Sequence, residues 1–338
     1  MFDFGILHEK EFDIPIISIG NITIGGTGKT PHTEYLVSML GELGMQVAVV
    51  SRGYKRKTKG YVLASRKSTA VEIGDEPFQI KKKFPDTIVA VDAKRNRAVQ
   101  KLLGGQEAPQ VFVLDDAYQH RFIAPGLSIL LIDYNRLIYN DYLLPIGRLR
   151  EPASERSRAD ILIVTKCPLT MQPIEMRIID KRLNCSPSQR LYFSSFNYGT
   201  IYNVFDSTKH YSTESLKKQE AQILIVTGVA SPEPLYGYIL KKIGRYETIR
   251  FSDHHSFTKE NWNRISKKYA AIKNKKKLIL VTEKDAARIY SDKNVPNLLK
   301  EHIYTIPLHV KFLCNGEEPF KNQIINYVKE NKRDGRFS

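Results

Sequence analysis

Cysteine is scarce in this sequence. Only three of the 338 residues are cysteines, Cys167, Cys185 and Cys314, and they lie far apart with no C-x-x-C pair. An odd number of widely spaced cysteines argues against a disulfide framework and against a zinc ribbon. The absence of an H-E-x-x-H motif argues against a zinc enzyme as well. A reducing compartment such as the cytoplasm is the simplest location.

Long apolar runs are absent too. The start, residues 1–5, lacks the basic region and the long apolar region of a secretory signal, and no later stretch approaches about 18 uninterrupted apolar residues. We therefore expect no membrane-spanning helix in this chain. Internal repeats and low-complexity segments are missing, which excludes solenoids and propellers.

Positive charge is in excess. Lys and Arg number 52 and Asp and Glu number 36, so the net charge is +16 at neutral pH. This excess predicts an acidic partner, which the charge alone leaves open between nucleic acid, anionic lipid headgroups and a phosphorylated small molecule. The basic clusters are scattered, which favours solvated faces over one binding tract; they lie at 52–59, 81–83, 275–277 and 329–336.

Short apolar runs alternate with helical or long connecting stretches, and the length suits two ordinary domains. Continuous apolar runs are typical of strands that are buried on both faces of a parallel sheet. The pattern predicts a three-layer α/β/α domain with a mainly parallel sheet, and its expected strands cover 14–19, 47–50, 88–91, 111–114, 129–132 and 161–164.

The strand pattern thins between residues 186 and 219, where the sequence becomes polar, aromatic and rich in turns. We place the joint between two domains there. New strands are expected at 223–226 and 278–281, so the second domain is also predicted to be α/β, and smaller. The expected domains are residues 1–200 and 201–338.

The strongest motif is a glycine-rich turn that follows the first expected strand and precedes an expected helix. Such a turn points successive backbone N–H groups at phosphate oxygens, and the helix N-terminus adds about half a positive charge. Lys29 would reach the β- and γ-phosphates of a nucleotide, and Thr30 would offer its hydroxyl to Mg²⁺. Residue 23 is Thr, where the strict G-x-x-x-x-G-K-[ST] motif has Gly. The turn consists of Thr23, Ile24, Gly25, Gly26, Thr27, Gly28, Lys29 and Thr30.

Two acids directly follow the expected strand 111–114. A phosphate-binding loop needs a second metal anchor, normally an acid at the end of a neighbouring strand, and Asp115 is the first choice, with Asp116 beside it. Asp133, at the end of another expected strand, competes for this role. An Asp pair is also common as a turn or a helix cap.

Two further acidic motifs are candidates for a catalytic base. Gly74-Asp75-Glu76-Pro77 places carboxylates on a loop or a helix start, and Asp253-His254-His255 sets an acid beside two imidazoles in the second domain. Each has a structural alternative, because such sequences also occur as capping turns and as exposed surface.

Together these residues resemble the tetraacyldisaccharide 4′-kinases of lipid A biosynthesis, over nearly the whole chain. The resemblance implies ATP- and Mg²⁺-dependent phosphorylation of the 4′-hydroxyl of a tetraacylated glucosamine disaccharide 1-phosphate, at the cytoplasmic face of the inner membrane. The anionic membrane surface and this lipid A precursor are thus the implied partners, without nucleic acid or an obligate protein partner. The blocks that carry the resemblance are 20–31, 51–54, 74–77, 115–120, 144–145 with 149–152, 158–160, 164–166, 227–230, 253–254 and 282–286.

The resemblance also implies roles for single residues. Asp75 matches the catalytic base of the family, and His254, rather than His255, matches the histidine paired with it, so both domains would close over ATP. The turn at 23–30, with Lys29, matches the nucleotide cradle. The implied metal ligands are Thr30, Asp115 and Asp116. The resemblance does not say which of the two acids binds the metal directly. Weaker candidates for substrate or phosphate contacts are Arg52, Arg148 and Arg150.

The sequence departs from the family in three places. The family usually carries a further N-terminal segment that anchors to the membrane, so either the true start lies upstream or this chain holds the bilayer through basic and apolar surface. Ala117 stands where the family commonly has Gly, and we expect little effect. Arg148 stands where the family usually has Pro.

Two other functional classes are alternatives to this interpretation. One is another P-loop protein, such as a GTPase-like metallochaperone or a carboxylase-type ATP enzyme. The stretch Val164-Thr165-Lys166 faintly resembles a guanine-binding motif, but Pro168 stands where that motif has Asp. The other is nucleic-acid binding, for which the sequence has no recognisable motif and no interleaving of aromatic with basic residues.

Overall fold

A computed structural model describes residues 9–105 and 108–331, and the chain folds into two compact units. The smaller unit consists of Tyr198–His309 with Thr69–Val71, and all other described residues belong to the larger unit. The predicted boundary at residue 200 is close to this division. The predicted end of the second domain at 338 differs from it, because the chain from Val310 onward returns to the larger unit.

The C-terminal helix α11 (Glu317–Glu330) shows why this return occurs. Its buried residues Phe320, Ile324 and Val328 form one apolar face. The Tyr327 hydroxyl accepts a hydrogen bond from Ile16 N at 2.9 Å and donates one to Ile16 O at 3.1 Å. The sequence of an amphipathic helix shows that it has an apolar face but does not show which core that face covers. Only the tertiary structure therefore assigns α11 to the larger unit.

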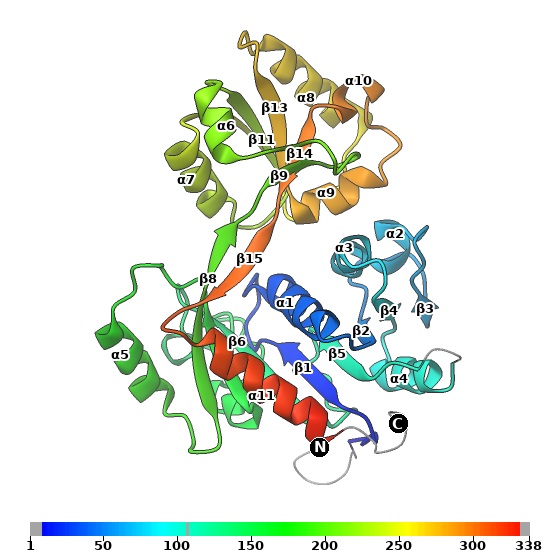
Figure 1. The fold of residues 1–338 in the computed structure, drawn as a ribbon, viewed down its shortest axis with the longest axis vertical. Helices are drawn as coiled ribbons and strands as arrows, with labels where there is room; N and C mark the ends of the chain where they lie inside the picture. Colours follow the sequence, from blue (N-terminus) through cyan, green and yellow to red (C-terminus); the bar gives the residue numbers. More distant parts are fainter. Residues whose placement is uncertain (1–8, 106–107, 332–338) are drawn as a thin grey trace. The chain divides into compact units, whose positions relative to one another are not determined.

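The larger unit is built on a nine-stranded sheet (Figure 1). Each of the six predicted strands is present. Neighbouring strands from β8 to β4 pair in parallel, and β3 runs antiparallel to β4. The order across the sheet is β15 (Leu308–Phe312), β8 (Arg190–Tyr198), β7 (Ile161–Thr165), β6 (Leu127–Asp133), β1 (Ile16–Gly20), β5 (Val111–Asp115), β2 (Val47–Ser51), β4 (Ile88–Val91) and β3 (Val62–Leu63).

Helices cover this sheet because its strands are apolar on both faces. Ala48, Val50 and Phe112 pack against Ala98 and Val99 of α4 (Arg95–Leu103), and α1 (Lys29–Glu42) contacts β1, β2 and β5. The predicted three-layer α/β/α architecture is confirmed. No helix in the described part of the chain is long and apolar enough to cross a bilayer. The remaining helices of this unit, with the short α2 shared between units, are α1 (Lys29–Glu42), α2 (Ala70–Ile73), α3 (Asp75–Lys83), α4 (Arg95–Leu103), η1 (Ile138–Asn140), η2 (Ala153–Arg158) and α5 (Pro173–Leu183).

The smaller unit is α/β as predicted, with a six-stranded sheet. The four strands β14, β13, β11 and β12 pair in parallel, and β9 and β10 add antiparallel strands at one edge. Trp262, the only tryptophan of the chain, is buried in the core on one face of this sheet. The sheet order is β10 (His210–Tyr211), β9 (Ile201–Asn203), β14 (Ile303–Ile306), β13 (Lys277–Thr282), β11 (Gln222–Thr227) and β12 (Arg245–Arg250); the helices are α6 (Thr213–Lys218), α7 (Glu233–Lys242), α8 (Lys259–Ala271), α9 (Glu283–Tyr290) and α10 (Asn297–Lys300).

Candidate active site

The glycine-rich turn joins β1 to α1, which is the context that the sequence predicted. Gly25 and Gly26 are exposed, and a Cβ atom added at either would meet nothing within 4 Å. Gly28 caps the helix with φ 89°, and Lys29 and Thr30 form its first turn. Open space therefore faces the turn at the N-terminus of a 14-residue helix, where backbone N–H groups favour an anion.

Asn21, which sequence reasoning did not select as a site residue, organises this turn. It is fully buried directly after β1. Its Nδ2 donates to Thr27 Oγ1 at 2.9 Å, and its Oδ1 accepts from Lys29 Nζ at 3.4 Å. Arg150 Nη2 donates to Asn21 O at 3.0 Å and also contacts Asn21 Oδ1. A polar residue at the carboxyl end of a buried strand was the signal that could have identified it.

Asp116 joins the same cluster. Its Oδ1 lies 3.5 Å from Lys29 Nζ and 3.5 Å from Arg150 Nη2. Its backbone is left-handed, with φ 49°, a conformation that non-glycine residues adopt mostly at special sites. The structure thus brings together three predicted residues, the lysine of the turn, one acid and one arginine.

Asp115 occupies a different environment from its neighbour. It ends β5 and is buried, and its two carboxyl oxygens each accept a hydroxyl hydrogen bond at 3.2 Å, one from Thr33 and one from Ser51. Burial, followed by the negative charges of Asp116 and Glu76, raises the pKa of Asp115 to about 6. A cation placed at this carboxylate would offset that cost, so the residues suit a divalent metal ion.

These residues fit Mg²⁺ only as part of a site in which nucleotide phosphates supply further ligands. The described residues hold no group of three or more His, Cys, Asp or Glu side chains that could cage a metal. Magnesium in phosphoryl-transfer sites is held through one or two carboxylates together with substrate phosphates and waters. Asp133 suits the role less well, because its Oδ2 lies 2.6 Å from Lys166 Nζ in an ion pair.

Asp75 begins helix α3 and is partly exposed. The preceding Gly74 approaches Gly53 so closely that a Cβ atom on it would lie 3.0 Å from Gly53 Cα. This approach brings the segment Arg52–Tyr54, which follows β2, beside the start of α3. Two blocks that are separated in sequence therefore meet near the carboxyl edge of the sheet, where the N-terminus of α3 stabilises the carboxylate.

A basic group borders Asp116. Arg95 is buried, its Nη2 donates to Asp116 O at 3.4 Å, and its Nε has no partner in the part of the chain that the structure describes. His120 Nε2 is likewise buried without a described partner. Burial, then the charges of Arg95 and Arg52, lowers the pKa of His120 to about 4. Arg52 thus lies within electrostatic reach of His120. Both Arg52 and Arg148 are exposed.

In the smaller unit, His254 lies in the segment after β12, and its ring lies between the side chains of Arg288 and Lys284. Its Nδ1 lies 3.2 Å from Arg288 Nη2 and its Nε2 lies 3.1 Å from Lys284 Nζ, while its backbone N donates to Gly228 O at 3.2 Å. These contacts gather the segments that follow β11, β12 and β13 at one edge of the smaller sheet. His255, the alternative, stacks on Phe251 and contacts Asn261 Oδ1 at 2.7 Å.

Behind His254 lies a buried ion pair. Asp285 is fully buried, and its Oδ1 lies 3.1 Å from Arg288 Nη1. Its Oδ2 accepts from Gly228 N at 3.1 Å and from Thr282 Oγ1 at 2.7 Å. The pair fixes the arginine that contacts the imidazole. The structure describes each unit by itself, so the pairing of His254 with Asp75 stays a prediction.

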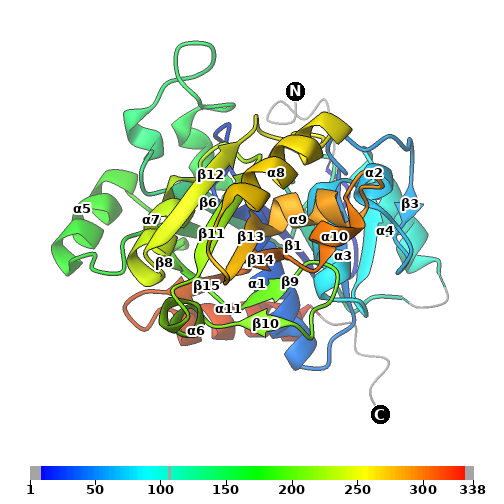
Figure 2. The same ribbon diagram turned by 90° about the horizontal axis from the view of Figure 1, so that it is seen from above.

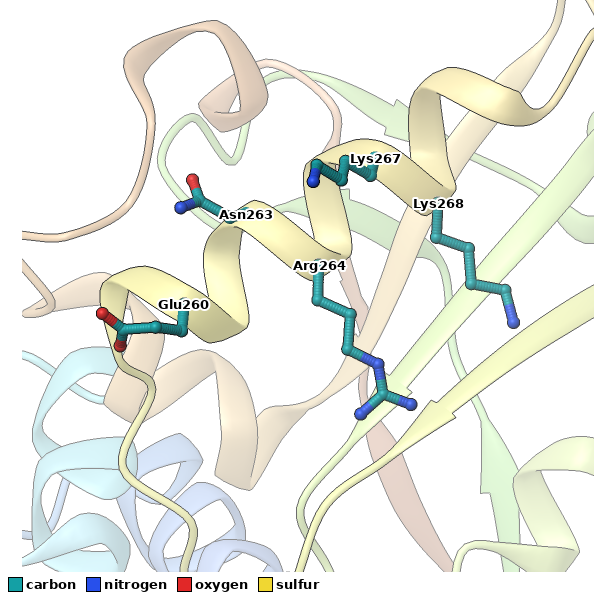
Figure 3. A pocket seen from close by; sticks show the side chains of 5 residues that line it. All are labelled: Glu260, Asn263, Arg264, Lys267 and Lys268. Atoms are coloured by element: carbon teal, nitrogen blue, oxygen red, sulfur yellow. The ribbon is translucent and has the colours of Figure 1, made fainter.

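A hollow also lies along α8 of the smaller unit, and it differs from the candidate site of the larger unit. Figure 3 shows its side chains projecting from successive turns of one helix. Lys268 is engaged with the sheet, donating to Thr248 O at 3.0 Å. The hollow is lined by Glu260, Asn263, Arg264, Lys267 and Lys268, without the backbone turn or the buried carboxylate of the larger unit, so it is a solvated basic face.

Comparisons with known proteins agree with this geometry. Residues 1–329 match the family described as tetraacyldisaccharide-1-P 4′-kinase. A tetraacyldisaccharide 4′-kinase of Phocaeicola vulgatus is 46% identical over 340 residues, covering 100% of this chain and 92% of the relative. One of Bacteroides fragilis is 47% identical over 338 residues, covering 99% and 90%. A crystal structure of LpxK from Aquifex aeolicus in complex with ATP has a TM-score of 0.71 at 26% identity, covering 97% and 92% of the two chains.

Proposed function

Because this chain belongs to the tetraacyldisaccharide-1-phosphate 4′-kinase family, we infer that it is an ATP-dependent kinase of the lipid A pathway. It transfers the γ-phosphoryl group of ATP to the 4′-hydroxyl of a tetraacylated glucosamine disaccharide 1-phosphate. The observation that carries this conclusion is the open turn between β1 and α1, with Lys29 at the start of the helix. The match of residues 1–329 to this family confirms the resemblance that the sequence indicated.

The turn is proposed to hold the phosphates of ATP. Its exposed glycines allow a close approach of backbone N–H groups, and the N-terminus of α1 adds partial positive charge. Lys29 then leaves its present contacts with Asn21 and Asp116 to reach the β- and γ-phosphates. Its charge is most useful as the phosphoryl group departs, when negative charge builds on the bridging oxygen.

Thr30, Asp115 and Asp116 are the residues proposed to hold Mg²⁺. When bound, the ion would neutralise charge on the phosphate oxygens. The buried carboxylate of Asp115 is already fixed by the hydroxyls of Thr33 and Ser51, so it is oriented before the metal arrives. Arg150 Nη2 lies 3.5 Å from Asp116 Oδ1 and is the contact that would remain when Lys29 moves to the phosphates.

Asp75 is proposed as the base that accepts the proton of the 4′-hydroxyl, with His254 as its partner. Support for Asp75 comes from its place at the N-terminus of α3, beside the Arg52–Tyr54 segment of the same sheet edge. Support for His254 comes from the residues that hold its ring, Arg288 and Lys284. Orientation of the base by a second polar group is the usual arrangement for general-base catalysis.

Arginines are proposed to bind the anionic parts of the substrate. Arg150 contacts Asn21 O beside the candidate phosphate site, and Arg52 and Arg148 are exposed. The net charge of +16 suits an anionic membrane surface at the cytoplasmic face of the inner membrane, where the chain would act as a peripheral protein.

The direct test is transfer of labelled γ-phosphate from ATP to a tetraacyl disaccharide 1-phosphate presented in detergent. We expect a product labelled at the 4′ position, and dependence on added Mg²⁺. Hydrolysis of ATP at the same rate with and without the lipid, and without labelled lipid, would instead favour a P-loop protein that uses ATP for conformational change. Retained ATP binding would show that such a preparation is folded.

A further inference from the structure

One stretch of the larger unit exposes apolar side chains without a break. Residues 142–146, Tyr-Leu-Leu-Pro-Ile, are all exposed, and none carries a charge. Tyr142 is 71% exposed and Ile146 is 88% exposed. Figure 2 shows a green loop, coloured as the residues just before 150, that stands away from β6 and α5. We call residues 142–146 the apolar loop. Concentrated exposed apolar side chains mark contact surfaces for membranes or proteins.

The shape of the apolar loop is fixed by its own backbone. Leu144 N donates to Leu149 O and Leu149 N to Tyr142 O, both at 2.9 Å, and Gly147 N donates to Leu143 O at 3.0 Å. A Cβ atom at Gly147 would overlap the carbonyl oxygen of Tyr142, so the turn closes only with glycine there. A loop with several of its polar backbone groups already paired enters an apolar phase at lower cost than a loop with none paired.

The foot of the apolar loop is polar and basic. A hollow there is lined by residues that include Arg136, Arg148 and Asn140, together with Ile146. The one acid of this hollow, Asp141, accepts hydrogen bonds through Oδ1 from Tyr142 N and Arg148 N. This arrangement suits an anionic bilayer, because the apolar side chains can enter the hydrocarbon while the arginines contact the headgroup phosphates.

The apolar loop is also tied to the phosphate-binding turn. Ile24 N donates to Arg148 O at 2.9 Å, and Arg150 N donates to Ile22 O at 2.7 Å. Ile24 itself is exposed. Whatever surface the loop contacts therefore lies beside the site at which phosphate is handled.

We propose that the apolar loop inserts into the surface of an anionic lipid bilayer, with Arg136 and Arg148 at the headgroup level. A lipid drawn from that surface then meets the phosphate-binding turn without leaving the bilayer. The choice of a lipid surface rests on the proposed function, since the substrate there is an acylated sugar phosphate. A protein partner or a second copy of this chain would contact the same residues, and the test separates these occupants.

The test is co-sedimentation of the full chain with phosphatidylcholine vesicles that contain phosphatidylglycerol, in the absence of ATP. Ile146→Ser is expected to weaken vesicle binding about tenfold, because the variant loses the transfer of one Ile side chain from water to hydrocarbon. Leu298→Ser is the matched control, because Leu298 is 87% exposed on α10 of the smaller unit, and it should bind as the wild type does. Equal binding of all three proteins would overturn the proposal.

A second measurement reports the position of the loop itself. Ile146→Trp should be quenched by brominated lipid, whereas Leu298→Trp should not, and the native Trp262 is buried in both. Absence of quenching at position 146 would overturn the proposal. So would a wild-type dimer, seen by sedimentation velocity without lipid, that Ile146→Ser dissociates while leaving vesicle binding intact.

Failure of the loop and failure of the kinase assignment give different results. Ile146→Ser should bind ATP as the wild type does, because the residue lies outside the turn. If the wild type transfers phosphate to lipid but Ile146→Ser still binds vesicles fully, only the loop inference fails. If the wild type transfers no phosphate while Ile146→Ser loses vesicle binding, only the kinase assignment fails.

Discussion

The carboxyl edges of the two parallel sheets differ in one respect that decides their roles. In the larger unit, the turn after β1 leaves Gly25 and Gly26 exposed to open space. In the smaller unit, the turn after β11 is occupied by the protein itself, because Gly228 N donates to the buried carboxylate of Asp285. An open turn suits an external anion such as a nucleotide phosphate, whereas a filled one supplies a rigid support.

The filled turn has its own use. Arg288 contacts Asp285, Gly228 O and the ring of His254. The buried carboxylate of Asp285 therefore positions the His254 ring through Arg288. We therefore propose that similar topology provides a binding site in the larger unit and a support for His254 in the smaller one. Four predictions test this contrast, and they run from the largest expected effect to the smallest.

Removal of the lysine from the open turn should have the largest effect. Lys29→Ala is expected to lower kcat/KM for phosphoryl transfer by about 10³-fold or more, since a cation on the transferring group is worth about that much. The labelled-phosphate assay measures it. Lys329→Ala, an exposed lysine on α11 of the same unit, is the matched control and should be unaffected. A Lys29→Ala enzyme with wild-type turnover would remove the phosphate role from the turn.

Asp75→Asn keeps the size of the side chain and removes its basicity. We expect kcat to fall by about 10²- to 10⁴-fold, the range for a general base, with little change in ATP affinity. Turnover and equilibrium binding of a fluorescent ATP analogue give the two numbers separately. Equal losses in both would assign Asp75 to nucleotide binding instead.

Breaking the ion pair of the filled turn should destabilise the smaller unit. Arg288→Met leaves the carboxylate of Asp285 buried without its cation, which is expected to lower the free energy of unfolding by about 3–5 kcal/mol. Denaturation followed by the fluorescence of Trp262 reports this unit, because that side chain lies in its core. Adding Asp285→Asn should restore part of the loss.

The matched control for this ion pair is on the surface. Arg250 and Glu233 also form an ion pair, but their side chains are 51% and 60% exposed. Arg250→Met should therefore change the free energy of unfolding by less than about 1 kcal/mol. Equal effects of Arg250→Met and Arg288→Met would show that the filled turn contributes no special stability.

The smallest effect concerns the acid at the open turn. Because the pKa of Asp115 is raised to about 6 in the folded protein, the folded state binds more protons than the unfolded state between about pH 4 and 6. Without metal, this residue therefore lowers stability as pH rises through that window, by an amount on the order of 2–3 kcal/mol.

Asp115→Asn should remove this contribution and stabilise the metal-free protein at neutral pH. Hydrogen exchange of the β5 amides, compared at pH 5 and pH 7 after correction for intrinsic rates, measures the change locally. His32, whose pKa burial lowers to about 4, contributes the opposite slope between about pH 4 and 6.5 and serves as the internal reference. No difference between Asp115→Asn and the wild type at either pH would contradict the role of burial.

The sequence by itself determined the open turn and the α/β class of both units. Local signals are sufficient for these, because a strand, a glycine-rich turn and a helix start are written in consecutive residues. The strand ends that carry Asp115 and Asp116 follow from the same logic. Asn21 was visible in the same stretch, but its role depends on contacts with Lys29 and Arg150 that no local pattern contains.

Only the tertiary structure decided which distant segments meet. It placed Gly53 against Gly74, returned α11 to the larger unit, and filled the second turn with a carboxylate that follows it by 57 positions. It also showed that the apolar residues after position 141 point to solvent instead of joining a core. Burial and long-range contacts depend on the packing of the whole chain. A run of apolar residues has the same sequence whether it lies in a core or is exposed to solvent.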